Sequence, residues 1–274
     1  RVPAWLCFFA LKLINNELRP KFLTTVHGFY SVNAYSRVMT FGDHVICVSN
    51  SIRDYVLENY PEINNKKNSV ILRGIDHKLY PHGYKPSQDW INKWHEDFPE
   101  TKNKTLISLP GRVTRLKGHE LFIELISELP NEYHGLIVGD IHSQKSEYYK
   151  ELNGRIKDAG LESRITFSGN RADVKEILAF SKVVLCLSIK PESFGRAVLE
   201  ALTLGTPTLG FNTGGVFEIL SKIFPEGILS VRKARLIAEK VMLMNENKIK
   251  PKPHNFFTIE QMLSDEISLY HSIA

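Results

Sequence analysis

The stretch that decides the fold of this chain reads Lys190-Pro-Glu-Ser-Phe-Gly-Arg-Ala-Val-Leu-Glu-Ala-Leu-Thr-Leu-Gly205. The apolar run Val183–Leu187 before it predicts a buried strand, and Gly195–Leu204 has the spacing of a helix that Gly205 ends. A strand that leads through a loop into a helix presents unpaired backbone N–H groups and the positive end of the helix dipole. The sequence therefore predicts an anion site where this helix begins.

Two carboxylates in this stretch are candidate ligand contacts. Glu192 lies in the loop, and Glu200 follows about two helical turns later. Helical side chains lean toward the helix N-terminus, so both carboxylates can face one ligand at the sheet edge. The alternative is that Glu192 caps the helix and Glu200 is a solvated surface residue. Because a strand, a loop, a helix start and a terminating glycine follow one another in the order that such a site requires, we favour the ligand-binding interpretation.

Regular alternation of strands and helices surrounds this stretch. Short apolar strands between helical patterns indicate βαβ units and a parallel sheet, which binds ligands at the carboxyl ends of its strands. Further strands are predicted at Leu106–Leu109, Leu136–Val138, Ile165–Ser168 and Pro207–Gly210. Helices are predicted at Glu120–Leu129, Tyr148–Ala159 and Asp173–Phe180, and another runs from after Val231 to about Met244. A terminal helix follows a capping box formed by Thr258 and Gln261.

Three other motifs combine residue types that bind anions or sugars. In Leu109-Pro-Gly-Arg-Val-Thr-Arg-Leu-Lys-Gly-His119, Gly111 permits close backbone approach, and Arg112 and Lys117 can converge on one anion. Arg115 in the same motif can bind the anion or be solvated. His27 and Gly28 follow a predicted strand, and Gly214 and Gly215 precede Glu218; each alone is more typical of a structural strand end or a turn.

The first hundred residues predict a smaller α/β domain. Helices are expected at Pro3–Leu18 and Ser51–Asn59, and strands at Leu23–Val26, His44–Ser49 and Ser69–Leu72. The stretch from Pro81 to Thr105 is polar apart from Trp90 and Trp94, and we expect the domain boundary there. We therefore predict a partial first domain over residues 1–100, a donor-binding domain over 101–250, and a linker with a terminal helix over 251–274.

Composition limits the class of protein. A length of 274 residues predicts about two domains, and a net charge of +5 is compatible with anionic ligands or a membrane surface but too weak to indicate nucleic acid. The three cysteines are far apart with no Cys-x-x-Cys pair, so neither a disulfide framework nor a zinc site is expected. No apolar stretch is long enough to span a membrane, and we expect a cytoplasmic protein. Since the first residue is Arg1, not Met, we expect a fragment of a longer chain.

Taken in order and spacing, these motifs resemble the retaining nucleotide-sugar glycosyltransferases of family four, which have the two-lobed GT-B fold. The resemblance runs from His27 to about Leu220. It rests on Gly111-Arg112 with Lys117-Gly118, Val138-Gly139-Asp140, Phe167-Ser-Gly169, Pro191-Glu-Ser-Phe-Gly195 with Glu200-Ala201, Gly205-Thr-Pro207, and Gly214-Gly215 with Glu218. It implies an α/β fold of two Rossmann-like parallel-sheet lobes facing a cleft, with the first lobe incomplete.

The resemblance also implies roles for individual residues. Arg112 and Lys117, beside Gly111, look like the pair that grips the donor diphosphate and stabilises the charge of the leaving nucleotide. Glu192 is similar to the residue that binds donor-sugar hydroxyls, and Glu200 to the one that binds the ribose hydroxyls.

Backbone N–H groups of Phe194 and Gly195, and the glycine pair Gly214 and Gly215, would face the phosphate or sugar. His27, from the other lobe, resembles the residue opposite the reacting sugar, and Arg171 sits where the family reads the base. The family needs no metal or other cofactor, and this chain has no Asp-x-Asp cluster.

The function that the resemblance implies is sugar transfer from a UDP-, GDP- or ADP-linked donor to a glycan or lipid-linked acceptor of the lipopolysaccharide or capsule type, with retention of configuration. The basic linker suggests an anionic or membrane-borne acceptor and peripheral contact at the inner face of the membrane. One alternative is a non-catalytic nucleotide- or sugar-binding module; another is a phosphorylase or sugar-nucleotide epimerase. One departure is the turn Arg73-Gly-Ile-Asp76, where the family often has Asn-Gly-Val-Asp; we expect it to change little.

Overall fold

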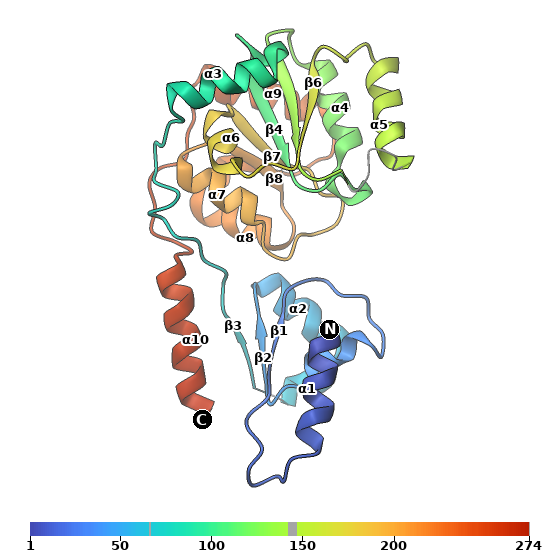
Figure 1. Cartoon of the computed structure of the whole chain (residues 1–274), viewed down its shortest axis with the longest axis vertical. Helices are drawn as coiled ribbons and strands as arrows, with labels where there is room; N and C mark the ends of the chain where they lie inside the picture. The colour runs from blue at the N-terminus through green and yellow to red at the C-terminus, as the bar shows by residue number, and fades with distance from the viewer. Residues whose placement is uncertain (66, 142–146, 274) are drawn as a thin grey trace. The chain divides into compact units, whose positions relative to one another are not determined.

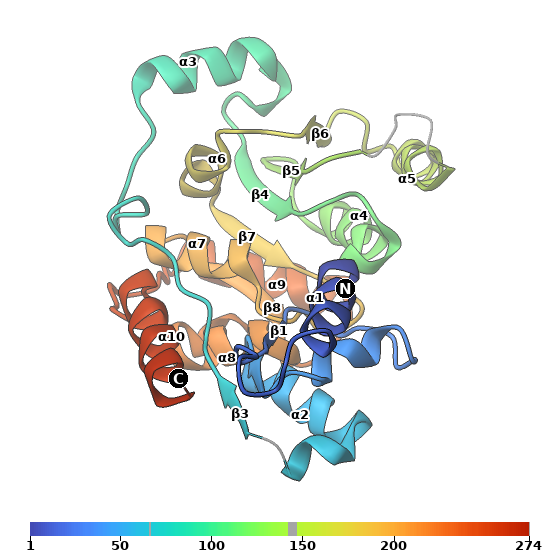
Figure 2. The ribbon, with the colours of Figure 1, turned by 60° about the horizontal axis from the view of Figure 1, so that its bottom comes forward.

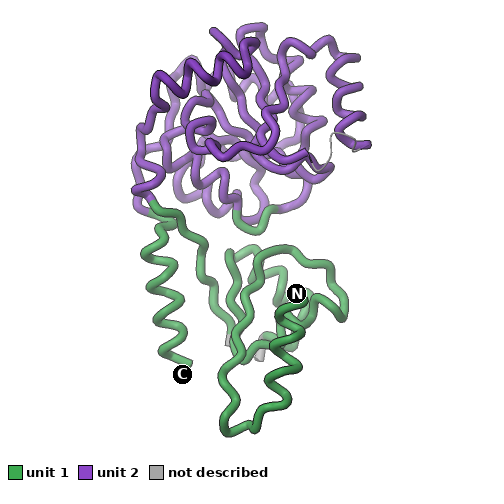
Figure 3. Tube along the Cα trace, viewed as in Figure 1, with its two compact units in different colours: residues 1–76, 192–194, 256–274 green, residues 77–191, 195–255 purple. Residues whose placement is uncertain are grey.

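A computed structural model of the chain describes residues 1–65, 67–141 and 147–273. They form two compact units (Figure 3). The first unit comprises residues 1–76, 192–194 and 256–274, and the second comprises 77–191 and 195–255. Each unit has its own sheet, in which all described strand pairs are parallel (Figure 1). The predicted α/β class with parallel sheets is confirmed.

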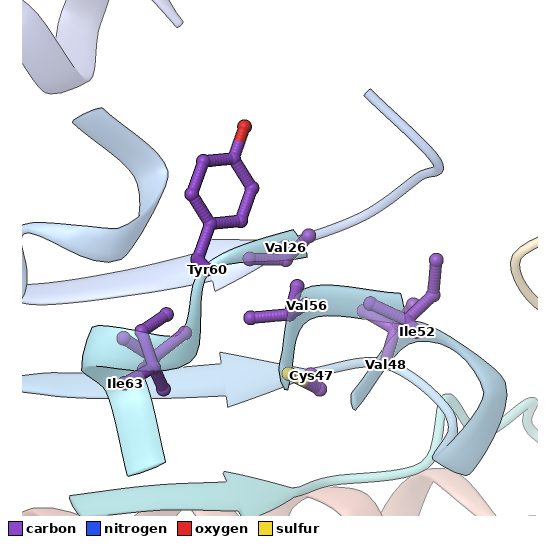
Figure 4. Packing of buried hydrophobic residues seen from close by; sticks show 8 residues of the cluster. Val26, Cys47, Val48, Ile52, Val56, Tyr60 and Ile63 are labelled. Atoms are coloured by element: carbon purple, nitrogen blue, oxygen red, sulfur yellow. The ribbon is translucent and has the colours of Figure 1, made fainter. Parts of the chain in front are cut away.

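The first unit is built on a three-stranded sheet in the order β1-β2-β3. Helix α2 packs on this sheet, and Figure 4 shows Ile52 and Val56 of the helix beside Val26 and Cys47 of the strands. The elements are α1 (Val2–Lys12), β1 (Leu23–Val26), η1 (Ser36–Thr40), β2 (His44–Cys47), α2 (Asn50–Asn59), η2 (Pro61–Asn65), β3 (Lys67–Val70) and α10 (Ile259–Ile273).

Several predicted elements of this unit have different bounds; strand β2, for example, ends at Cys47 rather than at Ser49. Helix α1 ends at Lys12 rather than Leu18, because the Asn15 side chain accepts a hydrogen bond from the Glu17 N–H at 3.3 Å and stabilises a turn in place of the helix. Strand β3 begins two residues earlier than predicted, where Lys67 pairs with His44.

The second unit contains a six-stranded sheet in the order β6-β5-β4-β7-β8-β9. Its strands are β4 (Thr105–Pro110), β5 (Tyr133–Val138), β6 (Ile165–Gly169), β7 (Val183–Cys186), β8 (Thr208–Phe211) and β9 (Ile228–Leu229). Its helices are α3 (Gln88–Asp97), η3 (Pro99–Thr101), η4 (Arg115–Lys117), α4 (His119–Glu128), α5 (Glu147–Asp158), α6 (Val174–Phe180), α7 (Arg196–Leu204), α8 (Gly214–Ile223), η5 (Pro225–Gly227) and α9 (Ala234–Glu246).

Helices cover both faces of this sheet (Figure 2). On one face, Leu136 and Val138 of β5 pack against Trp94 of α3 and Ile177 of α6. On the other face, Gly135 lies so close to α4 that an added Cβ would be 2.8 Å from the Ile126 side chain. Strands buried on both faces explain why the predicted apolar runs fall inside or beside the observed strands.

Helix α3 lies in the polar stretch where we expected a domain boundary. Ser87 caps it by accepting a hydrogen bond from the Trp90 N–H at 3.2 Å, and Trp94 is only 2% exposed. The first stretch of the first unit ends at Asp76, and residues 77–100 belong to the second unit.

Helix α8 was also unpredicted, since it begins at the glycine pair that we interpreted as a turn. Gly214 has a φ of 64°, in the left-handed region that glycine favours, and the helix continues for 10 residues. Among the described residues, no helix is long and apolar enough to cross a membrane.

Candidate functional site

Three helices of the second unit begin without a side-chain cap at neighbouring strands. Strands β4, β7 and β8 are adjacent in the sheet and lead to α4, α7 and α8. The N-cap residues Gly118, Gly195 and Thr213 accept no capping hydrogen bond through a side chain. By contrast, Ser49 caps α2 and Ser87 caps α3. Unsatisfied N–H groups at one sheet edge form a site for an anion.

The loop of residues 111–118, which we name the phosphate loop for the role proposed below, places the Lys117 side chain over a glycine. Gly111 has a φ of 138°, and a Cβ there would lie 3.1 Å from Lys117 Cε, so the lysine side chain lies directly over the glycine. Gly118 has a φ of 77°, and its added Cβ would be 2.2 Å from the Leu187 carbonyl oxygen. Arg112 in this loop is exposed. The two glycines thus let a cation and the start of α4 approach the sheet edge.

Backbone contacts connect the loops after β4, β5 and β6. The Gly111 N–H donates to the Val138 carbonyl at 2.8 Å, and the Gly139 N–H donates to the Gly169 carbonyl at 3.0 Å. A Cβ on Gly139 would lie 2.1 Å from the Gly111 carbonyl oxygen. The glycines of the predicted motifs therefore hold three strand ends together.

The loop between β7 and α7 carries Glu192 and Phe194. Glu192 is half-buried, and the N-cap residue of α7 is Gly195. Phe194 is buried, with its ring 5.9 Å from that of Phe257. Gly195 has a φ of 101°, and its added Cβ would be 2.7 Å from Val216 of α8. This close contact brings the first turns of α7 and α8 together.

Glu200 is buried rather than solvated. Its side chain is 9% exposed, and one carboxylate oxygen accepts a hydrogen bond from Arg196 Nε at 2.7 Å. Burial, followed by the Glu200 charge, raises the pKa of Tyr80, which is hydrogen-bonded to this carboxylate. The solvated alternative is therefore wrong, and Tyr80 is a neighbour of the site that the sequence did not reveal.

Arg171 lies in a pocket of about 360 Å³ between α3 and the loop after β6. Its guanidinium donates to both carboxylate oxygens of Asp173, at 2.8 and 2.7 Å, and lies 5.7 Å from the ring centres of Trp94 and Phe98. The hydrogen bonds from Arg171 lower the pKa of Asp173. The residue predicted to read the base is therefore engaged in an ion pair.

Arg115, whose role the sequence left open, contacts α5. Its Nη2 lies 2.6 Å from a Glu151 carboxylate oxygen, and its guanidinium lies 4.7 Å from the Tyr148 ring centre. Arg115 is therefore engaged with α5 in the structure. Among the residues that the structure describes, no group of three or more His, Cys, Asp or Glu side chains could hold a metal ion.

His27 follows β1 in the first unit, and its partner is Arg73. Arg73 Nη2 lies 3.0 Å from His27 Nδ1. We expected the turn that carries Arg73 to change little, so this contact with His27 was not predicted. Partial burial, followed by the Arg73 charge, lowers the pKa of His27.

Comparison with known proteins identifies the family. The chain matches the family described as "Glycosyl transferases group 1" over residues 91–257, more than half its length. The chain belongs to this family. Residues 1–79 match a second description, "Glycosyltransferase Family 4".

Two curated relatives of this group 1 chain have named activities. It is 28% identical over 230 residues to N-acetyl-alpha-D-glucosaminyl L-malate synthase of Bacillus anthracis, covering 80% of this chain and 56% of the relative. It is 27% identical over 169 residues to the lipopolysaccharide core biosynthesis mannosyltransferase LpsB of Rhizobium meliloti, covering 56% of this chain and 43% of the relative. The group 1 chain therefore spans about half the length of these relatives.

Solved structures confirm the GT-B fold class. A glycosyltransferase from Rickettsia africae is 26% identical with a TM-score of 0.81, covering 100% of this chain and 75% of that one. Anabaena Alr3699/HepE in complex with UDP and glucose is 23% identical with a TM-score of 0.75, covering 90% of this chain and 66% of that one.

Proposed function

We propose that this group 1 chain is the catalytic part of a glycosyltransferase that moves a sugar from a nucleotide-diphosphate sugar to a glycan or glycolipid acceptor, with retention of configuration. The observation that carries the proposal is the convergence of three uncapped helix starts at β4, β7 and β8, with Lys117 lying across Gly111 in the first of these loops. A diphosphate supplies the negative charge and the hydrogen-bond acceptors that such an edge lacks.

The phosphate loop provides the main catalytic groups. When the bond between the sugar C1 and the diphosphate oxygen breaks, the electron pair leaves with the diphosphate. Lys117, Arg112 and the N-termini of α7 and α8 stabilise that charge. The acceptor hydroxyl forms the new bond to C1 from the face that the diphosphate leaves, and its proton passes to a departing phosphate oxygen. No step in this scheme needs a metal ion.

Other residues bind and orient the donor in this proposal. Glu192 binds sugar hydroxyls, buried Glu200 binds the ribose hydroxyls, and Arg171 lies near the base. Backbone N–H groups at Phe194, Gly195, Gly214 and Gly215 face the phosphate or sugar. His27, which belongs to the first unit, is proposed to contact the reacting sugar.

Relatives and neighbours support the substrate class. Alr3699/HepE was solved with UDP and with UDP-glucose, and LpsB is named as a mannosyltransferase of the lipopolysaccharide core. We therefore propose a UDP-, GDP- or ADP-linked donor and a lipid-linked saccharide acceptor. The basic linker with Lys248, Lys250 and Lys252 supports contact with an anionic membrane surface on the cytoplasmic side.

A donor-turnover assay tests this function. The chain is incubated with UDP-, GDP- and ADP-sugars, with and without a lipid-linked saccharide, and release of the nucleoside diphosphate is measured. We expect release with one donor base and an increase when acceptor is present. Saturable nucleotide binding without release would overturn the transferase in favour of the non-catalytic binding module.

A further inference from the structure

His27 and Arg73 meet at the carboxyl edge of the first-unit sheet. His27 directly follows β1, and Arg73 comes three residues after β3. Arg73 Nη2 lies 3.0 Å from His27 Nδ1. A guanidinium has hydrogen-bond donors and no acceptor, and it stays charged at every relevant pH. Nδ1 must therefore accept this hydrogen bond, which leaves the ring proton of neutral His27 on Nε2.

Helix α10 holds Arg73 from the opposite side. Arg73 Nη1 lies 3.7 Å from Met262 Sδ and 3.8 Å from a Glu266 carboxylate oxygen. The turn that carries Arg73 is joined to the start of α10, because the Ile75 N–H donates to the Phe257 carbonyl at 3.0 Å and the Ile75 carbonyl accepts from Ile259 at 3.0 Å.

Gly74 permits this junction. A Cβ there would lie 2.1 Å from the Thr258 carbonyl oxygen, so no other residue fits at position 74 without moving α10. Arg73 is thus held by a fixed turn and by a helix far away in sequence, and both constrain the direction of its guanidinium.

We infer that Arg73 is a positioning residue that fixes His27 as the neutral Nε2–H tautomer, so that His27 offers the sugar substrate a hydrogen-bond donor and not a proton acceptor. The contact of His27 with substrate rests on the proposed function. The tautomer itself rests only on the geometry of the first unit.

The charges around His27 give opposite predictions for two variants. Partial burial and then Arg73 lower the pKa of His27, whereas Glu266 raises it. Arg73→Met removes the lowering charge and the donor to Nδ1, so the pKa of His27 should rise. Glu266→Gln removes the raising charge and should move the pKa of His27 further down.

Long-range ¹H–¹⁵N spectra of the chain with ¹⁵N-labelled histidine test the tautomer without substrate. Signals of His27 are assigned by their loss in His27→Gln. We expect Nδ1 to be unprotonated and Nε2 protonated in the neutral ring, both tautomers to appear in Arg73→Met, and the wild-type pattern to return in Arg73→Lys. A protonated Nδ1 in the wild-type neutral ring, or the same pattern in Arg73→Met, would overturn the inference.

Kinetics separate this inference from the proposed function. We expect Arg73→Met to lower kcat about tenfold at neutral pH while the donor KM changes less than about twofold, with Arg73→Lys recovering most of the loss. If the spectra show the expected tautomer and His27→Gln transfers sugar as fast as wild type, the role of His27 in the proposed function fails and the Arg73 inference stands. Equal losses in kcat for Arg73→Met and Arg73→Lys would contradict the positioning role.

Discussion

At the scale of single residues, Lys117 shows how a glycine determines the position of a charge. The lysine occupies the space that a side chain at position 111 would fill, with its Cε 3.1 Å from the place of the missing Cβ. The charge is thereby placed by the backbone of the phosphate loop before a ligand arrives. A charge that is already in position needs no reorganisation when the transition state forms.

We predict that Lys117→Ala lowers kcat/KM by at least about a hundredfold with the fold intact, because the departing diphosphate loses a preorganised positive charge. Donor turnover and circular dichroism are the measurements. Lys157→Ala is the matched control, since Lys157 is an exposed lysine near the end of α5 and should leave turnover unchanged. Similar turnover in Lys117→Ala and Lys157→Ala would reject the assigned phosphate loop.

A second residue-scale prediction concerns Glu200. Its buried carboxylate, held by Arg196, is proposed to bind the ribose hydroxyls. We expect Glu200→Ala to weaken UDP binding about tenfold or more, because a charged hydrogen bond is lost, and to leave binding of 2′,3′-dideoxy-UDP nearly unchanged. Calorimetric titration with both nucleotides measures the difference. If binding of both nucleotides weakens equally, Glu200 has a structural role and does not bind the ribose hydroxyls. Glu200→Gln is a second variant, which keeps the shape of the side chain and removes its charge.

At the scale of elements, the starts of α4, α7 and α8 are the feature on which the proposed ligand binding depends. Their N–H groups have no side-chain cap, in contrast to α2 and α3, whose serine caps satisfy the same groups. A ligand with phosphate oxygens therefore supplies what the second unit lacks.

We predict that the matching nucleoside diphosphate raises the melting temperature of the chain by several degrees at a concentration about a hundred times its Kd, since binding to the folded state alone adds about 2.7 kcal/mol of stability. The corresponding nucleoside lacks the phosphates and should raise it far less. A thermal-shift series with UDP, GDP, ADP and their nucleosides is the measurement. If none of the diphosphates raises the melting temperature at millimolar concentration, the anion site is not where we place it.

The sequence predicted the strands well and two helices poorly, for physical reasons. Strand β7 was predicted to within one residue of its observed bounds because a strand buried on both faces is a short apolar run, here Val-Val-Leu-Cys. Helix α3 was missed since its apolar anchors, Trp90 and Trp94, stand alone in a polar stretch, and α8 was missed because two glycines begin it.

The candidate site was predicted in part. Motif spacing placed Gly111, Lys117 and Gly195 between a strand and the helix that follows it, where the structure has them. The pairing of Arg73 with His27 was beyond sequence reasoning, because it joins residues 46 positions apart through a side chain whose direction α10 determines. Only one of the two hydrogen bonds of the predicted capping box is present at α10. The Thr258 side chain accepts from the Gln261 N–H at 3.2 Å, whereas the Gln261 side chain donates to Asp265 and not back to Thr258.

At the scale of the whole molecule, buried histidines make stability depend on pH. His119 and His134 are fully buried, and burial lowers the pKa of each from 6.5 to about 4. His134 Nε2 is bonded to Thr166 at 2.9 Å, and the ring of His119 packs against that of Tyr148 with their centres 5.9 Å apart. Between about pH 4 and pH 6.5, both rings are therefore neutral in the folded chain, whereas the same histidines bind protons in the unfolded chain.

The contribution of these neutral histidines to the free energy of unfolding should therefore be complete above about pH 6.5. It should fall as the pH drops toward 4, because the unfolded state binds protons there and the folded state does not. Urea unfolding between pH 7.5 and 5.5 measures the loss. His134→Gln keeps a donor for Thr166 and cannot be protonated, so the fall should be smaller in this variant. The same fall in both proteins would show that His134 does not contribute.

The first unit is built from stretches that lie far apart in the sequence, since residues 1–76 pack with residues 192–194 and 256–274 while most of the sequence between them forms the second unit. A ribosome makes the chain from its N-terminus, so the second unit can complete its sheet before α10 exists. The environment of His27, which needs Arg73 and Glu266 together, then forms only after α10 has been made. A chain that stops before α10 would fold its second unit and still leave His27 without the helix that directs Arg73.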